Sequence, residues 1–175
     1  AGMRGQLVTP ILDFPTNYAQ NIDEYVKKAV VLAEKYSDSS LIDIGFGPHA
    51  PYTVSDDSFK KIIKANEKLN LPIQIHLHET KGECDESQKN FGMRPMERLN
   101  KLGLFDFDVQ CVHMTQMIEE EVELAHSKNL SIIHCPESNM KLASGICPVP
   151  KLLAKGVNVA LGTDGAASNN DLNLL

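Results

Sequence analysis

The sequence lacks the features that would mark a nucleic-acid-binding, membrane-bound or disulfide-stabilised protein. Its 17 Lys and Arg residues are mixed with 23 Asp and Glu residues, for a net charge of -6, and form no basic stripe for nucleic acid or anionic lipid. No apolar run is long enough to cross a bilayer and no charged-then-apolar leader is present, so we expect neither membrane insertion nor secretion. The four cysteines form no Cys-x-x-Cys pair, which argues against a zinc ribbon and favours reduced thiols in a cytoplasmic protein.

A glycine-rich nucleotide-binding turn is also missing. Gly45 and Gly47 follow an apolar run, but Pro48 stands where a phosphate-binding helix would begin. The chain has 175 residues with 42% apolar content, which is enough for one globular domain with a sizeable core. With nucleic acid and membrane disfavoured, a small molecule is the expected partner.

Short apolar runs alternate with longer stretches of helical periodicity, which predicts an α/β fold. Gly, Pro and Asn bound these runs, and Ser55 followed by two aspartates is typical of a helix N-terminus. The pattern predicts strands at residues 6–12, 41–46, 73–77, 109–112, 130–134 and 158–161, and helices at residues 22–36, 55–69, 94–102, 118–127 and 149–154.

Polar side chains stand at the ends of three predicted strands. His76 and His78 close one strand, His113 closes the next, and Asp164 follows the last. A barrel of parallel strands places its carboxyl ends at one mouth, where active sites form, so a (β/α)8 barrel fits better than an open doubly wound sheet. Imidazole nitrogens and carboxylate oxygens are also ligands of catalytic divalent metals. The sequence therefore predicts a metal-dependent site at the mouth of a barrel.

The segment around His76 carries two further candidates. In an extended strand His76 and His78 share one face, so both imidazoles are expected to point toward the mouth. A lone strand histidine is more often structural, but Glu79 follows at the strand end and favours a functional interpretation. A carboxyl group partly shielded from water can be tuned toward neutral pH, so Glu79 is a candidate proton shuttle.

The other strand ends each have a structural alternative. Asp164 lies in a glycine-flanked turn and could be a helix N-cap, but the residues that follow start helices poorly, and a ligand or base is favoured. His113 could orient a water molecule or be a core histidine, and the sequence leaves both open. His49 lies between two prolines in a rigid loop, where a substrate contact is predicted. His134 and Asn139 could support a neighbouring site residue or shape the loop, and a structural role is favoured for both, while His126 is expected to face solvent.

Five segments form a pattern in fixed order. They are Gly45-Phe-Gly-Pro-His-Ala-Pro-Tyr52, Ile75-His-Leu-His-Glu-Thr80, Val112-His-Met-Thr115, Pro136-Glu-Ser-Asn-Met-Lys-Leu142 and Leu161-Gly-Thr-Asp-Gly-Ala-Ala-Ser-Asn-Asn170. This pattern resembles the amidohydrolase superfamily, and more narrowly its 5′-methylthioadenosine/S-adenosylhomocysteine deaminases, often labelled chlorohydrolases of the TRZ/ATZ group. The resemblance covers nearly the whole chain, and several motifs in order are more specific than any one alone.

The resemblance implies a role for each candidate. It makes His76 a metal ligand on the fifth barrel strand, and Asp164 a metal ligand and base on the eighth. Glu79 resembles the acid and base that serves a ring nitrogen, and His113 the sixth-strand histidine beside the hydrolytic water. His49, Glu79 and Asp164 are implied substrate contacts. The implied cofactor is one divalent metal, zinc or else iron, and the implied reaction releases ammonia from an aminated purine-type ring. Hydrolysis of a ring chloride or N-substituent is the alternative.

Some parts of the family pattern are absent from this sequence. The six predicted strands correspond to strands three to eight, so residues 1–175 are interpreted as a partial barrel domain without the first two strands, the C-terminal helix and the small β-sandwich. The His-x-His pair of the first strand, which completes the metal site, is among the missing parts. We therefore expect the chain alone to be inactive and to hold metal poorly. A non-catalytic fragment that forms homo-oligomers through its exposed strand edges is the rival interpretation.

Substrate choice depends on one further position. Members of the family that use S-adenosylhomocysteine can carry an arginine just after the third strand, which binds the carboxylate of the substrate. Here Thr9 and Pro10 occupy that neighbourhood, and Arg4 and Arg94 are the nearby cations that could replace it. We therefore expect methylthioadenosine to be used at least as well as S-adenosylhomocysteine.

Overall fold

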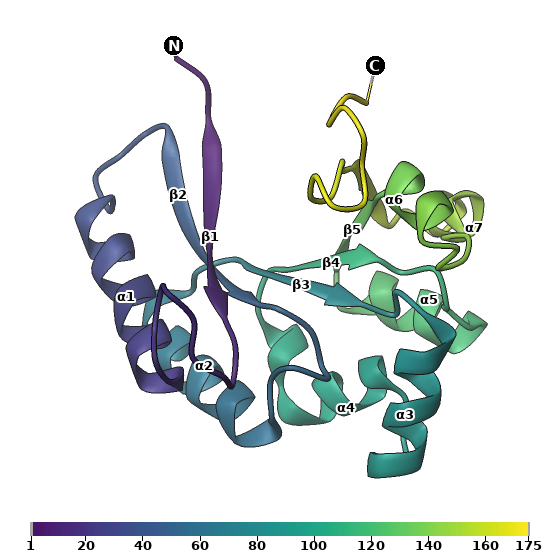
Figure 1. Ribbon diagram of the computed structural model, residues 1–175, viewed down its shortest axis with the longest axis horizontal. Coiled ribbons are helices and arrows are strands. Elements are labelled where there is room, and N and C mark those ends of the chain that lie inside the picture. Colours follow the sequence, from purple (N-terminus) through teal and green to yellow (C-terminus); the bar gives the residue numbers. More distant parts are fainter. Residues whose placement is uncertain (1, 175) are drawn as a thin grey trace.

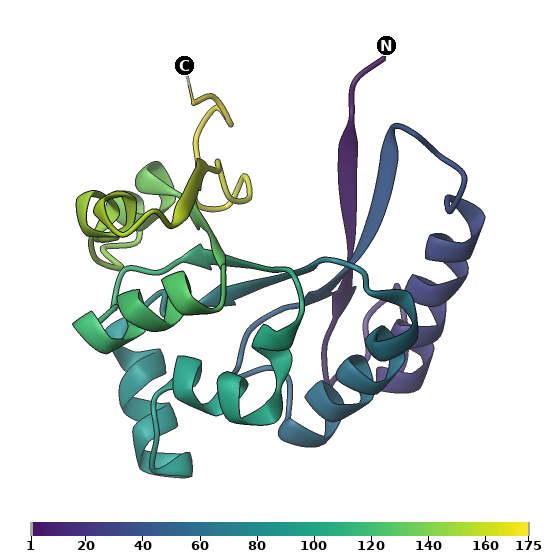
Figure 2. The ribbon, with the colours of Figure 1, turned by 180° about the vertical axis from the view of Figure 1, so that it is seen from behind.

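Residues 2–174 are described by a computed structural model, in which six parallel strands form one curved sheet (Figure 1). Seen from behind, the first and last strands stand apart from each other (Figure 2). The strands are β1 (Gly5–Ile11), β2 (Ile42–Pro48), β3 (Ile73–Leu77), β4 (Val109–His113), β5 (Ser131–His134) and β6 (Asn158–Leu161). The helices are α1 (Ile22–Lys35), α2 (Asp56–Leu69), α3 (Lys81–Phe91), α4 (Pro95–Leu102), α5 (Glu119–Ser127), α6 (Pro136–Lys141) and α7 (Val149–Ala154), with a short 3-10 helix, η1 (Leu104–Asp106). None of the helices in residues 2–174 combines the length and apolar character of a transmembrane span.

Each strand pairs in parallel with the next strand in the sequence, in the order β1-β2-β3-β4-β5-β6. The register of β3 and β4 places His76 beside Val112 and Leu77 beside His113. Because all strands run in one direction, their carboxyl ends lie at one edge of the sheet. This is the predicted α/β fold, a partial barrel, and it brings the residues that follow β3, β4 and β6 to the same mouth.

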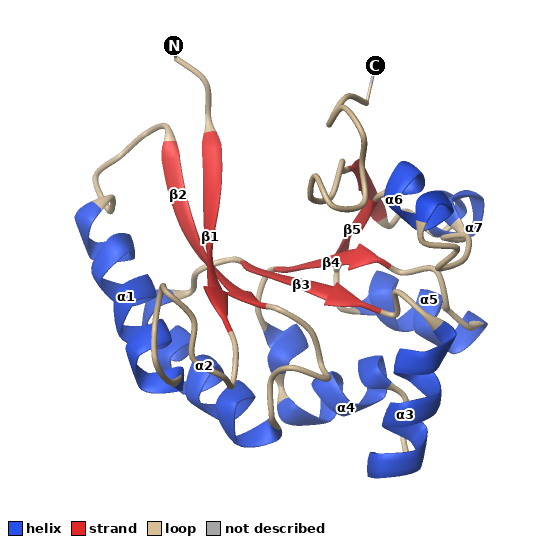
Figure 3. Cartoon of the chain, viewed as in Figure 1, coloured by secondary structure: helices blue, strands red, loops and turns tan. Residues whose placement is uncertain are grey.

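The helices line the outer side of the curved sheet (Figure 3), and their apolar residues share one core with alternate strand residues. In β3, Ile73, Ile75 and Leu77 are buried in this core, while Gln74 and His76 are only partly buried. Side chains alternate across a strand, so Gln74 and His76 face the inside of the curve. Each large apolar side chain buried here contributes about 1.5–3 kcal/mol. The helices contribute Tyr25, Phe59, Ile62, Met96, Leu99 and Val122 to the core.

Local signals fix the ends of α2 as predicted. The Ser55 hydroxyl accepts a hydrogen bond from the N–H of Ser58, and acidic residues occupy the first turn. The helix ends at Asn70, whose φ of 48° is in the left-handed region that asparagine tolerates.

Two helices, α3 and α6, are absent from the predicted elements. The buried face of α3 consists of Glu83, Cys84 and Ser87, so the segment has no apolar stripe that hydrophobic periodicity could detect. Helix α6 has only six residues and follows β5 after a single residue, Cys135. Its sequence, Pro-Glu-Ser-Asn-Met-Lys, contains a single large apolar residue and therefore shows no apolar periodicity.

Gly45 allows β2 to lie close to the neighbouring strands. A Cβ atom at this position would be 2.6 Å from the Pro72 carbonyl oxygen and 3.1 Å from Cγ1 of Val8. A side chain at position 45 would clash with the Pro72 carbonyl oxygen, which cannot move aside because it belongs to the backbone. The first glycine of the Gly-Phe-Gly run therefore has a packing role in the sheet.

Candidate metal centre and active site

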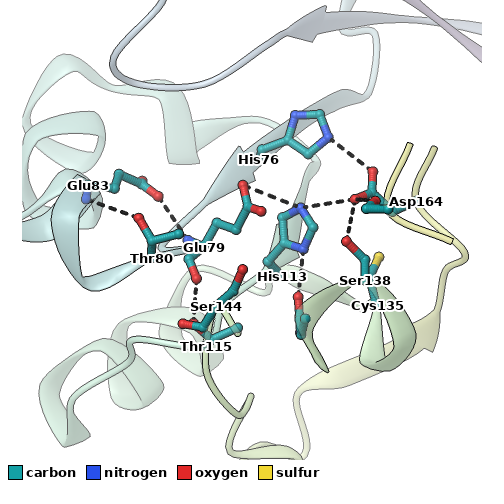
Figure 4. A network of polar contacts seen from close by, with 12 residues as sticks. His76, Glu79, Thr80, Glu83, His113, Thr115, Cys135, Ser138, Ser144 and Asp164 are labelled. Atoms are coloured by element: carbon teal, nitrogen blue, oxygen red, sulfur yellow. Dashed lines mark hydrogen bonds and ion pairs between the residues drawn. The ribbon is translucent and has the colours of Figure 1, made fainter. Parts of the chain in front are cut away.

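Three strand ends bring His76, His113 and Asp164 together (Figure 4). His76 Nε2 lies 4.0 Å from Asp164 Oδ1, and His113 Nε2 lies 3.9 Å from Asp164 Oδ2. One candidate ligand atom from each residue lies within 4.8 Å of the other two. Two ligands that each lie about 2.0–2.2 Å from a tetrahedral metal ion are about 3.5 Å apart, so the observed atoms are spaced slightly wider than bound ligands and leave room for an ion between them. The prediction that these side chains converge on one mouth is confirmed.

Second hydrogen bonds fix the two imidazoles in the form that a metal requires. His76 Nδ1 lies 2.8 Å from the His49 carbonyl oxygen, which can only accept, so Nδ1 carries the proton and Nε2 keeps its lone pair. His113 Nδ1 lies 2.9 Å from Oδ1 of Asn139, which likewise leaves Nε2 facing the mouth. Metal-bound histidines are commonly held in this way by a hydrogen bond to the other ring nitrogen. The donor set therefore fits a divalent metal.

The Asp164 carboxylate is oriented by two hydroxyl groups. Ser138 and Ser168 each donate a hydrogen bond of 2.7 Å to its Oδ2 atom. Partial burial acts to raise the pKa of Asp164, but these two hydrogen bonds and the backbone N–H of Gly165 outweigh it, and the pKa is below its usual value. No helix begins at Asp164, so the N-cap alternative does not apply. An ionised, fixed carboxylate suits both metal binding and proton transfer.

Glu79 lies on the opposite side of His113 from Asp164. Its Oε2 atom is 3.8 Å from His113 Nε2, and its side chain keeps 18% of its exposure. Figure 4 shows the carboxylate of Glu79 directed toward the His113 ring. We call His76, Glu79, His113 and Asp164 the mouth cluster.

His49 borders the mouth cluster through its ring and its backbone. Its ring centroid lies 5.1 Å from that of His76, and its carbonyl accepts from both Nδ1 and the backbone N–H of His76. The Nδ1 atom of His49 lies 2.9 Å from the Thr53 hydroxyl. Burial, together with the neighbouring His76, lowers the pKa of His49. A neutral imidazole beside the mouth is compatible with the predicted substrate contact.

His78 corrects one prediction. Strand β3 ends at Leu77, and the backbone turns at His78 with a φ of 51°, so the strict alternation of side chains stops before this residue. The ring is fully buried, with Nδ1 at 3.3 Å from Glu121 and Nε2 accepting from the N–H of Met96 at 3.2 Å. The prediction that His76 and His78 both point toward the mouth is therefore wrong for His78.

Arg94 lies beside His78 and forms hydrogen bonds with other residues of the protein. Its Nε and Nη2 atoms lie 2.7 and 3.0 Å from the two carboxylate oxygens of Glu121, and Nη2 also donates to the Gln116 carbonyl. Burial alone would raise the pKa of Glu121, but hydrogen bonds from His78 and Arg94 lower it to about 2. We call His78, Arg94 and Glu121 the buried cluster. Its arginine directs Nε and Nη2 to Glu121 and Gln116, away from the mouth cluster.

Three other candidates lie outside the mouth cluster. Arg4 precedes β1, at the edge of the sheet opposite the carboxyl ends of the strands. His134 ends β5 and is partly buried, while His126 is exposed on α5, as expected for both. These positions support structural or surface roles.

Sequence reasoning missed two residues that orient the mouth cluster, Ser138 and Ser168, and favoured a structural role over a supporting one for a third, Asn139. Ser138 and Ser168 bind Asp164, and Asn139, expected to be structural, binds His113. Two of the three lie in the first turn of α6, directly after β5. Their place after another strand end is the signal that could have identified them.

Comparison with known proteins places this geometry in a family. The model of the amidohydrolase family matches residues 1–175. A 5-methylthioadenosine/S-adenosylhomocysteine deaminase of Saccharophagus degradans is 52% identical over 174 residues, which are 99% of this chain and 39% of that protein. The crystal structure of an adenosine deaminase from Xanthomonas campestris with bound zinc has a TM-score of 0.93 and 46% identity, over 97% of this chain and 38% of that one. A zinc-bound atrazine chlorohydrolase of Arthrobacter aurescens, with a TM-score of 0.87 and 22% identity over 99% of this chain and 40% of its own, shares the fold. The chain thus spans about two fifths of the length of these proteins, and it belongs to the amidohydrolase family.

Proposed function

We propose that this chain is part of a metal-dependent hydrolytic deaminase that acts on an aminated purine-type ring, such as that of methylthioadenosine or S-adenosylhomocysteine. The convergence of His76, Glu79, His113 and Asp164 at one mouth carries the proposal. The names of the relatives in Saccharophagus and Xanthomonas support the substrate class. In this proposal residues 1–175 supply strands three to eight of a barrel. We call the protein that joins them to the other two strands, the C-terminal helix and the β-sandwich the complete enzyme.

His76 and Asp164 would hold the metal, with His113 Nε2 beside it. Zinc is the proposed ion, since the Xanthomonas relative contains it, and iron is the alternative. When bound, a divalent metal supplies acidification of a water molecule, from a pKa of 15.7 to about 7.

The remaining steps belong to the side chains of the mouth cluster. Asp164, held ionised by its two serines, receives the proton of the attacking water, and His113 orients that water. Glu79 gives a proton to the ring nitrogen as the water oxygen bonds to the ring carbon that carries the amine. The proton taken by Asp164 then passes to the amine, the carbon–nitrogen bond breaks and ammonia leaves, while the new hydroxyl group gives its proton back to Glu79 and becomes the ring carbonyl. His49 contacts the substrate beside the metal.

Ammonia release tests the proposal. The complete enzyme should release ammonia from methylthioadenosine, and Asp164→Asn should abolish the release and lower the metal content. The present chain alone should show no turnover, because two protein ligands hold zinc poorly compared with the three of usual catalytic sites. Turnover of methylthioadenosine by the chain alone, abolished by Asp164→Asn, would contradict the expectation of inactivity. Release of chloride from a chlorinated ring, with no release of ammonia, would favour the chlorohydrolase alternative.

A further inference from the structure

The loop that carries Glu79 is held by side chains and by backbone hydrogen bonds from Thr115 and Gln116, which follow β4, to the His78 carbonyl. Strand β3 ends at Leu77, and His78 then adopts a left-handed conformation that costs a non-glycine residue about 1 kcal/mol or more. The N–H of His78 donates to Oε1 of Glu83 at 2.9 Å, and the N–H of Glu79 donates to Oε2 of the same carboxylate at 2.8 Å. From the other side, the Thr115 hydroxyl donates to the Glu79 carbonyl at 2.6 Å.

Glu83 departs from the helix-capping role that its sequence position predicts. Thr80 caps α3 by accepting from the N–H of Glu83, and a glutamate three residues after a threonine usually bonds the N–H of that threonine. Here the carboxylate reaches past Thr80 to the N–H groups of the two residues before it. Its oxygens therefore serve the loop that carries Glu79 and not the end of the helix.

The placement of Glu83 is also costly. The residue is 7% exposed, and burial is the main cause that raises the pKa of its carboxyl group. Within residues 2–174, no lysine or arginine forms an ion pair with it. Two backbone N–H groups are thus its hydrogen-bond donors. Burial of a carboxylate costs free energy that its hydrogen bonds must offset, and both hydrogen bonds to Glu83 come from the turn that carries Glu79.

We propose that Glu83 is a positioning residue for Glu79. Its carboxylate accepts hydrogen bonds from both N–H groups of the His78–Glu79 turn and so keeps the Glu79 carboxylate beside His113. The inference rests on the proposed function, in which Glu79 serves the ring nitrogen. Misplacement of a reacting group by about 1 Å costs on the order of 100-fold in rate, so a loosened turn should be visible in kcat.

The test replaces Glu83 by an amide of the same shape. In Glu83→Gln one carboxylate oxygen becomes an NH2 group, which faces an N–H donor and cannot accept from it. In the complete enzyme with methylthioadenosine, we expect kcat to fall about 10- to 100-fold, with KM and bound metal changed by less than about twofold. Glu86→Gln, an exposed change on the same helix, should leave all three unchanged.

Amide hydrogen exchange on the same proteins separates positioning from general stability. Glu83→Gln should speed exchange at the N–H groups of residues 78 and 79 and leave residues 74–76 of β3 unaffected. An unchanged kcat, or a parallel loss of kcat, metal and melting temperature, would overturn the inference. If the unmodified complete enzyme releases no ammonia from any aminopurine nucleoside, the proposed function fails. In that case hydrogen exchange still tests whether Glu83 holds the turn. Unchanged exchange at residues 78 and 79 in Glu83→Gln would overturn this role.

Discussion

The mouth cluster and the buried cluster both pair histidine with carboxylates near the end of β3, and the buried cluster adds an arginine, yet the spacing of the paired atoms differs. In the mouth cluster, the imidazole nitrogens and carboxylate oxygens lie 3.8 to 4.0 Å apart. In the buried cluster, Glu121 lies 2.7 Å from Arg94 and 3.3 Å from His78. The first spacing is too long for hydrogen bonds and leaves room for a ligand, while the second satisfies the groups within the protein.

Exposure follows the same division for the pairs His76–Asp164 and His78–Glu121, although His113 in the mouth cluster is 1% exposed and Arg94 in the buried cluster is 26% exposed. His76 and Asp164 keep 33% and 21% of their side-chain exposure, whereas His78 and Glu121 keep 0% and 7%. Two histidines separated by one residue thus have different roles because the strand ends between them. Residue type alone would not separate a reactive group from a structural one here.

The largest effect should come from the mouth cluster. Glu79→Gln removes the proton donor for the ring nitrogen and keeps the size of the side chain. In the complete enzyme, kcat should fall by about 10²–10⁴-fold, which is the usual contribution of a general acid or base. Metal content should stay constant, because Glu79 is not among the proposed ligands. Steady-state ammonia release measures kcat, and metal analysis measures the metal content. Wild-type kcat in Glu79→Gln would remove this residue from the mechanism.

The buried cluster should instead affect stability. Glu121→Gln leaves Arg94 without its carboxylate, and because Arg94 is partly exposed the loss should cost about 1–3 kcal/mol, less than in a fully buried pair. Denaturant unfolding of the complete enzyme measures the change, with Glu120→Gln, an exposed change on the same helix, as the control. Metal content at the mouth should not change. Equal unfolding free energies for the two variants would show that the ion pair contributes nothing.

The same carboxylate gives a pH dependence of stability. The pKa of Glu121 is about 2 in the folded protein and near 4.5 ordinarily. A lowered pKa stabilises the folded state above pH 4.5, and this contribution is lost as the pH falls toward 2. The stability difference between wild type and Glu121→Gln should therefore shrink on acidification. A difference that stays constant from pH 6 to pH 3 would argue against this cause.

The smallest effect concerns the substrate tail. Arg94 belongs to the buried cluster, and the Thr9 hydroxyl donates to the Gly45 carbonyl at 3.2 Å, so neither residue is placed to bind a substrate carboxylate. An arginine-carboxylate bond contributes about 1.5–3 kcal/mol, or tenfold and more in specificity. Without it, kcat/KM for methylthioadenosine should equal or exceed that for S-adenosylhomocysteine. A preference of more than about tenfold for S-adenosylhomocysteine would mean that another cation binds the tail.

Most of the fold could be predicted because its strands are short apolar runs separated by turn residues. The mouth cluster could be predicted because parallel strands bring their ends together, whatever their distance in the sequence. His78 could not, since its direction depends on whether β3 ends one residue earlier or later. Helix α3 could not be predicted because its buried face is polar. The contacts of Ser138 with Asp164 and of Asn139 with His113 join residues 26 positions apart, and only the order of strands in the sheet brings these residues together.

The order of the strands has a consequence for folding. Every pairing in the described sheet joins a strand to its immediate successor, so no strand must wait for a distant segment before it can pair. Short-range pairing lowers the entropy lost on loop closure, and domains begin to form while the ribosome is still adding residues. We therefore expect this sheet to grow one βα unit at a time as it emerges, with each new strand adding to the edge left by the one before.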